Sequence, residues 1–138
     1  MRADYPLILQ TGMREKTYHH SRFREQPWAR KVSPDPHVYI HPRTAAEANV
    51  EDGSWVLVET PGAAGSCRLK VRLTEDTKVG VLTTGVGWWL PEAPAPYFGA
   101  RDVNINAALP YGRRADPYSG SADTRGVACR LRALAADA

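Results

Sequence analysis

The residues most able to do chemistry lie together near the N-terminus, in the segment TGMREKTYHHSRFR between Thr11 and Arg24. Glycine permits close approach of a ligand to the backbone, so Thr11 and Gly12 at the end of a strand can present N–H groups. The segment also carries three Arg, two His, one Tyr and one Ser. These donors suit phosphate oxygens, or the carbonyl and ring nitrogens of a heterocycle. The sequence therefore predicts a binding loop here, with a solvated charged loop as the alternative.

The reactive side chains of this segment do not predict a catalytic centre. His20 and Ser21 are adjacent, and neighbours in an extended segment point to opposite sides, which disfavours a nucleophile–base pair. Two adjacent histidines do not make a metal site without further ligands. Cys67 and Cys129 are far apart, and neither belongs to a CxxC pair. We expect neither a catalytic residue nor a metal ligand in this chain.

A second cluster, from Gly85 to Glu92, contains the pair Trp88 and Trp89. Indole rings can form the wall of a site for a planar ligand, or they can pack in a core. The residues alone favour neither interpretation.

A third cluster begins at Asn104 and ends at Gly120. The amides of Asn104 and Asn106 can recognise the edge of a polar heterocycle, although Asn is also an ordinary turn residue. Asp116 and Ser119 belong to a pattern typical of a turn, which favours a structural role.

The positive charge is concentrated at the start of the chain. The whole sequence has a formal charge of +3, whereas residues 1–31 hold seven Lys and Arg against three Asp and Glu, a net charge of +4. An anionic partner near this segment would explain the excess.

The composition predicts short elements that carry these clusters. The 138 residues suit one domain, and 11 Gly with 11 Pro favour tight turns and exclude a helical bundle. No apolar run approaches the roughly 20 residues that span a bilayer. Alternating or apolar segments predict strands at residues 6–10, 38–40, 55–59, 66–73, 79–84 and 127–134. A short turn or helical segment is predicted at residues 104–109.

One short helix is predicted from Thr44 to Asn49. Thr44 is the expected N-cap, and Glu47 would complete a capping box. Asn49 tolerates the left-handed conformation that ends a helix. His41 is expected to be a turn residue.

The order of the motifs resembles that of one family. TGxR and YxHSxxR follow the first strand; IHPxTA, EDGxWVxVETP, GWWxPE, NxN, DPxSG and a final strand with a cysteine come after them. This order resembles the C-terminal molybdopterin-dinucleotide-binding domain of the dimethyl-sulfoxide-reductase family of molybdenum and tungsten enzymes. The resemblance runs from Tyr5 to about Leu131. It implies a single domain over residues 1–138, with a barrel at about 5–134.

The resemblance also implies a fold, a cofactor and a set of contacts. The fold is a six-stranded double-psi β-barrel of the aspartate-decarboxylase type, with short helices and long loops that face the cofactor. The cofactor is bis(molybdopterin guanine dinucleotide), with molybdenum or tungsten ligated outside this chain. The resemblance places Glu15 where its carboxylate can hold a pterin amino group. The implied cofactor-binding residues are Thr11, Gly12, Arg14, Glu15, Tyr18, His20, Ser21, Arg24, Trp88, Asn104, Asn106 and Ser119.

By this resemblance the chain is one part of an oxidoreductase. It would be a C-terminal domain or a small subunit, and we expect no turnover from it alone. The expected partners are the remaining domains or a large subunit, together with an iron–sulfur electron-transfer partner. A cytoplasmic location is slightly favoured over a periplasmic one.

Two other classes of function compete with this interpretation. A β-barrel could use its basic, aromatic loop on nucleic acid, but the basic excess is small for that purpose. A protein-interaction barrel could instead dock a partner through Trp88, Trp89 and the Pro-rich segment that follows.

Overall fold

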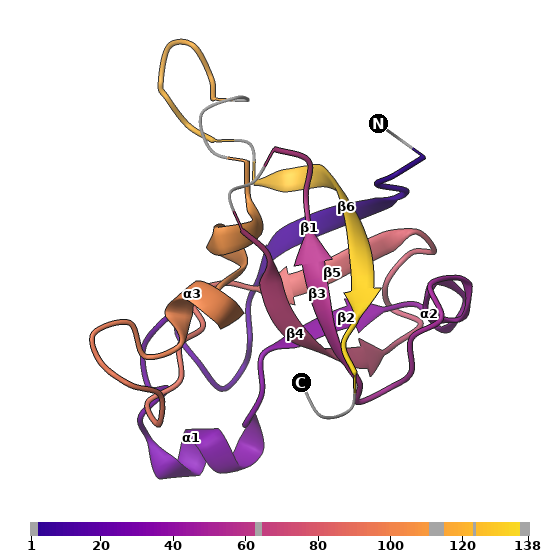
Figure 1. Ribbon diagram of the computed structural model, residues 1–138. Helices are drawn as coiled ribbons and strands as arrows, with labels where there is room; N and C mark the ends of the chain where they lie inside the picture. The colour runs from indigo at the N-terminus through magenta and orange to yellow at the C-terminus, as the bar shows by residue number, and fades with distance from the viewer. Residues whose placement is uncertain (1–2, 63–64, 111–114, 123, 136–138) are drawn as a thin grey trace.

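The described chain folds into a closed six-stranded barrel, which confirms the expected fold class (Figure 1). The computed structural model describes residues 3–62, 65–110, 115–122 and 124–135. The strands are β1 Leu7–Met13, β2 His37–Ile40, β3 Trp55–Glu59, β4 Cys67–Leu73, β5 Val81–Gly85 and β6 Arg125–Ala133.

Alternation of side chains along each strand builds the core. Successive residues of a strand point to opposite faces, so every second residue enters the barrel, and these inward residues are mainly apolar. Val56 and Val58 on β3 are fully buried, whereas Leu57 between them is only partly buried. The same period places Leu69 and Val71 of β4 inside. The other strands contribute Leu9, Val38, Ile40, Leu82, Val127 and Cys129 to this core.

Around the barrel the strands follow the order β1-β5-β2-β4-β3-β6. The pairs β1/β5 and β2/β4 are parallel, and the other four pairs are antiparallel. The register places Tyr39 of β2 beside Arg72 of β4 and Thr83 of β5. These three residues alternate with buried neighbours, so they form a row on the outer face of the barrel.

β1 differs from the expected strand at its C-terminal end. The Thr-Gly step does not end the strand, which continues to Met13 through an irregularity in its pairing with β5 between Thr11 and Met13. Gly12 has a positive φ of 86°, a conformation that favours glycine. The bulge therefore belongs to the strand and turns the chain into the loop that follows.

The helix predicted from Thr44 begins earlier and has a different cap. α2 spans Pro42–Glu47, and the Nδ1 atom of its N-cap, His41, accepts a hydrogen bond from the Arg43 N–H at 3.1 Å. The Thr44 side chain is instead buried and accepts a hydrogen bond from the Gly80 N–H at 2.8 Å. The capping-box prediction was therefore wrong, because Pro42 is suited to the first helical position. The left-handed conformation of Asn49 is confirmed, with a φ of 54°.

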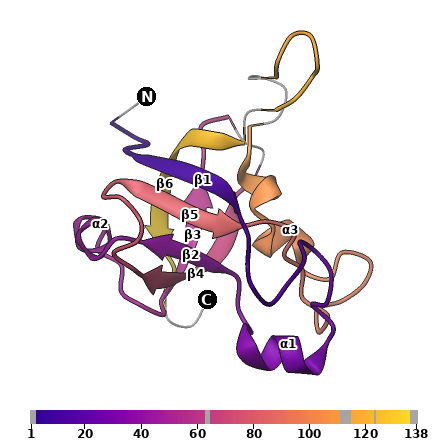
Figure 2. The same cartoon turned by 180° about the vertical axis from the view of Figure 1, so that it is seen from behind.

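Three further short helical elements lie beside the barrel (Figure 2). They are α1 Pro27–Val32, α3 Ala100–Val103 and the 3-10 helix η1 Ile105–Ala108. η1 agrees with the predicted helical turn, whereas α1 and α3 were missed. Neither of the missed helices has a side-chain hydrogen bond at its N-cap, and each has at most six residues. No helix in the described ranges is long and apolar enough to cross a bilayer.

We expect Leu82→Ala to destabilise the barrel, because Leu82 is completely buried in the core. Removing a buried leucine costs about 2–5 kcal/mol through lost burial and the cavity left behind. Urea denaturation would measure the free energy of unfolding. The control is Val79→Ala, because Val79 is 46% exposed and lies just before β5, the strand that contains Leu82. Equal stability of the two variants would contradict the assigned core.

We expect both thiols to be unreactive while the protein is folded. Cys67 and Cys129 are fully buried, and burial raises the pKa of each thiol, that of Cys129 to about 12. The thiolate is the reactive form, so little of it is present at pH 8. A colourimetric thiol reagent should detect both groups only after denaturation. Rapid labelling of the native chain would be incompatible with this burial.

Candidate functional site

A second, smaller core lies outside the barrel and holds the long loops together. It consists of Tyr18, Ala29, Trp88 and Val103, which are all buried, with Leu90 packed against them. These residues come from the loop after β1, from α1, from the loop after β5 and from α3. We call this set the loop core. Because its members come from the β1–β2 and β5–β6 connections, the loop core joins these two long connections into one unit.

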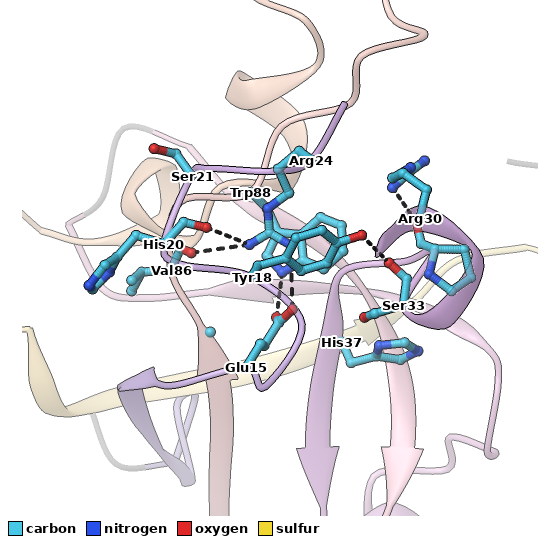
Figure 3. A network of polar contacts seen from close by, with 12 residues as sticks. Glu15, Tyr18, His20, Ser21, Arg24, Arg30, Ser33, His37, Val86 and Trp88 are labelled. Carbon is cyan, nitrogen blue, oxygen red and sulfur yellow. Dashed lines mark hydrogen bonds and ion pairs between the residues drawn. The ribbon is translucent and has the colours of Figure 1, made fainter. Parts of the chain in front are cut away.

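The Arg24 side chain is the charged centre of the loop core. Arg24 is only 1% exposed. Its guanidinium carbon lies 3.6 Å from the centre of the Trp88 ring and 3.9 Å from that of Tyr18, so the group contacts both rings, whose planes meet at 74° (Figure 3). Desolvated cation–π contacts of this kind are stabilising. Burial lowers the pKa of Arg24 and the Glu15 carboxylate raises it, and an Arg side chain remains charged in proteins.

Glu15 supplies the negative charge for this buried cation. Its Oε2 atom lies 3.4 Å from Nη1 of Arg24, and its Oε1 atom accepts a hydrogen bond from Trp88 Nε1 at 2.7 Å. A Cβ atom at Gly85 would lie 2.7 Å from the same Oε1 atom. Glycine at position 85 therefore leaves the space that the carboxylate occupies.

Arg24 also links two loop backbones. Its Nη2 atom donates to the carbonyl of His20 at 3.0 Å and, more weakly, to that of Val86 at 3.4 Å (Figure 3). His20 has a positive φ of 56°, and Phe23 has one of 70°. Non-glycine residues keep such conformations only when their surroundings hold them. The bond from Arg24 is one contact that holds His20.

The loop after β5 lies directly against the first loop. A Cβ atom at Gly87 would lie 2.9 Å from the backbone nitrogen of Ser21, and Gly87 has a φ of 75°. Trp89 Nε1 donates to the Ser21 carbonyl at 2.7 Å. The Tyr18 hydroxyl donates to the Ser33 carbonyl at 2.6 Å, and burial raises the pKa of this phenol.

The end of β1 and the loop that follows it carry several exposed polar groups. Gly12, Arg14, His20 and Ser21 are all exposed. Beside them lies a recess of about 150 Å³, whose lining residues are Met13, Arg14, Glu15, Tyr18, His19, His20, Arg24 and Val86. Backbone and side-chain N–H groups with a hydroxyl can serve an oxyanion or a polar ring edge.

The remaining candidate residues lie in three other settings. Thr11 is buried, and its hydroxyl donates to the Thr124 carbonyl at 2.6 Å. Asn104 joins α3 to η1, and its side-chain oxygen accepts from the backbone N–H of the exposed Asn106 at 3.2 Å. Ser119 is exposed in a turn, and its backbone N–H donates to Asp116 Oδ1 at 2.7 Å. That turn belongs to a loop that projects away from the barrel (Figure 1).

Eight of the twelve predicted residues lie in or beside the loop core, and Thr11, Asn104, Asn106 and Ser119 lie elsewhere. Tyr18, Arg24, Trp88 and Glu15 are joined to one another inside or beside the loop core, and the exposed donors lie on its surface. Sequence reasoning missed Gly85, Val86 and Gly87 as site residues, although the GVG spacing before the tryptophan pair was visible. The close packing of Gly85 and Gly87 against Glu15 and Ser21 is visible only in the structure.

Comparison with known proteins gives a consistent set of relatives. Residues 7–128 match a family described as the molydopterin dinucleotide binding domain. A dopamine dehydroxylase of Eggerthella lenta is 34% identical over 128 residues, which is 93% of this chain and 12% of that protein. An acetylene hydratase of Syntrophotalea acetylenica is 35% identical over 91 residues, which is 64% of this chain and 12% of that protein.

The fold has a solved counterpart. The acetylene hydratase from Pelobacter acetylenicus superposes with a TM-score of 0.87 and 28% sequence identity. The superposition covers 94% of this chain and 18% of that structure. The chain thus spans a small fraction of the length of the proteins that it resembles.

We expect Arg24→Gln to destabilise the protein strongly. The change leaves Glu15, whose side chain is 11% exposed, without its cation, and it removes the donor to His20. Breaking a buried pair by removing one partner costs about 3–5 kcal/mol. Arg24→Lys should recover only part of this stability, because lysine lacks the planar guanidinium that contacts both rings and donates to both loop carbonyls.

The measurement is urea denaturation, and the control is Arg22→Gln in the same loop. Arg22 is exposed, so the free energy of unfolding of the Arg22→Gln variant should differ by less than about 0.5 kcal/mol from that of the unchanged protein. If Arg24→Gln were as stable as Arg22→Gln, the loop core would not depend on the buried charge.

Proposed function

The chain belongs to the molydopterin dinucleotide binding domain family, and from this membership we propose that it forms one wall of the cofactor site in a larger molybdenum or tungsten oxidoreductase. The length of its relatives supports the second part of the proposal, since the chain corresponds to 12% of the dopamine dehydroxylase. The ligand is bis(molybdopterin guanine dinucleotide), whose metal is ligated outside this chain. Residues 1–138 act as a single domain.

The exposed donor set beside the loop core carries this proposal. Pyrophosphate oxygens need N–H donors and positive charge, which Arg14 and the backbone at Gly12 can supply. The pterins need hydrogen-bonding groups for their ring edges, and His20 and Ser21 lie on the same loop. These residues fit the chemistry of the cofactor. Asn104 and Asn106 would add contacts from the turn between α3 and η1.

The buried residues have a second role in this proposal. Tyr18, Arg24 and Trp88 hold the backbone of the loop, so they act on the cofactor mainly through the position of His20 and Ser21. Glu15 lines the small recess while it is bonded to Trp88 and Arg24, so one face of its carboxylate remains able to meet a pterin amino group. Thr11 would contribute through its backbone, because its hydroxyl is already bonded.

The bound cofactor supplies the metal-centred chemistry, and the protein supplies binding and orientation. This chain would bind the organic part of the cofactor, hold the donor groups in place and exclude water from one side. We propose that turnover requires the rest of the enzyme. The substrate and the electron partner are set there.

We expect Arg14→Ala and His20→Ala to reduce cofactor retention in the full protein that carries this chain. A charge-assisted hydrogen bond contributes about 1.5–3 kcal/mol, so each loss should weaken retention roughly tenfold or more. Elemental analysis for molybdenum and tungsten, with fluorescence of the oxidised pterin, measures the cofactor content directly.

Arg43→Ala is the matched control, because Arg43 is exposed on α2 and pairs with the exposed Glu47 at 3.0 Å. It should leave the cofactor content unchanged. Urea denaturation of all three variants separates lost binding from lost folding. Full metal and pterin content in both loop variants would refute the assignment of this face.

A further inference from the structure

A larger recess of about 720 Å³ lies on the outer face of the barrel. Its floor is the outward-facing row of Thr83, Tyr39 and Arg72 on adjacent strands. One wall is formed by residues 13–17, and a second by Thr74, Asp76 and Thr77. A cavity of about 300–1,000 Å³ is typical of sites for small molecules.

The cations of this recess have no ion-pair partner among the described residues. Arg14, Lys16 and Arg72 all line it, and none of them forms a salt bridge in the described part of the chain. The acidic Glu15 already bonds Arg24 and Trp88. Asp76 accepts a hydrogen bond from the Thr74 hydroxyl at 3.3 Å. The uncommitted charge in the recess is therefore predominantly positive.

The other lining groups favour an organic ligand over a bare ion. The Tyr39 ring, Met13 and Val32 offer apolar surface, and the hydroxyls of Tyr39 and Thr83 offer hydrogen bonds. His37 lines the recess beside Tyr39, with ring centres 6.1 Å apart. Burial lowers the pKa of His37, so the imidazole adds hydrogen-bonding groups without adding charge near neutral pH.

We propose that this recess binds a small organic anion, a carboxylate or phosphate that carries an apolar or aromatic body. Arg72 from the floor and Lys16 from one wall neutralise the acidic group, and the body lies against Tyr39. Arg72, Tyr39 and Thr83 belong to barrel strands and not to the loop core. The site therefore adjoins the proposed cofactor face, with which it shares the lining residues Met13, Arg14 and Glu15, but its floor lies outside that face.

The test is a titration of the ¹⁵N-labelled chain with phenyl phosphate, benzoate and benzyl alcohol, followed by amide chemical shifts. The two anions should change the amide chemical shifts of Tyr39, Arg72 and Thr83, and the uncharged alcohol should not. The tighter of the two anions identifies the acidic group as phosphate or carboxylate. The double variant Lys16→Gln with Arg72→Gln should weaken binding at least tenfold.

Lys78→Gln serves as the matched control, because Lys78 is exposed and outside the lining. It should bind as the unchanged protein does. Shifts centred on Gly12, His20 and Gly87, or no shifts with either anion, would overturn the proposal. A second measurement uses the full protein: if Arg72→Gln lowers its pterin content as Arg14→Ala does, the recess belongs to the cofactor site and the proposal fails.

Discussion

The rest of the site depends on one buried charge. A guanidinium group removed from water must be compensated by an opposite charge and by hydrogen-bond acceptors, or it destabilises the fold. Glu15, two aromatic rings and two backbone carbonyls compensate most of the Arg24 guanidinium, whereas its buried Nε atom has no hydrogen-bond partner among the described residues. Because the two carbonyls belong to different loops, satisfying the charge also fixes those loops relative to each other.

This constraint separates residues that shape the site from residues that face a ligand. Tyr18 and Trp88 use their ring faces on Arg24, and their polar atoms bond Ser33 and Glu15. They therefore offer little to a ligand directly. Arg14, His20 and Ser21 remain exposed. The segment between Thr11 and Arg24 therefore contains two kinds of residue: those that hold the loop in place and those that are exposed to a ligand.

The parts of the fold that follow local rules could be predicted, and the parts that depend on distant contacts could not. Strands such as β3 and β4 alternate apolar and polar residues, so their existence and buried faces were correctly predicted. The series of short strands already fits a small β-barrel, whereas its six-stranded double-psi form came from the resemblance to a family. α1 and α3 are too short to show a helical period. The burial of Arg24 depends on Trp88 and Val86, and Trp88 Nε1 bonds a carboxylate 73 positions away.

The pairing of the first strand with the last has a consequence for the synthesis of the chain. β1 lies between β5 and β6, so neither of its neighbours exists when it leaves the ribosome. An unpaired strand of this kind readily joins other chains. The N-terminal strand must therefore be kept from wrong partners until residues 125–133 have been made. Only then can the barrel close.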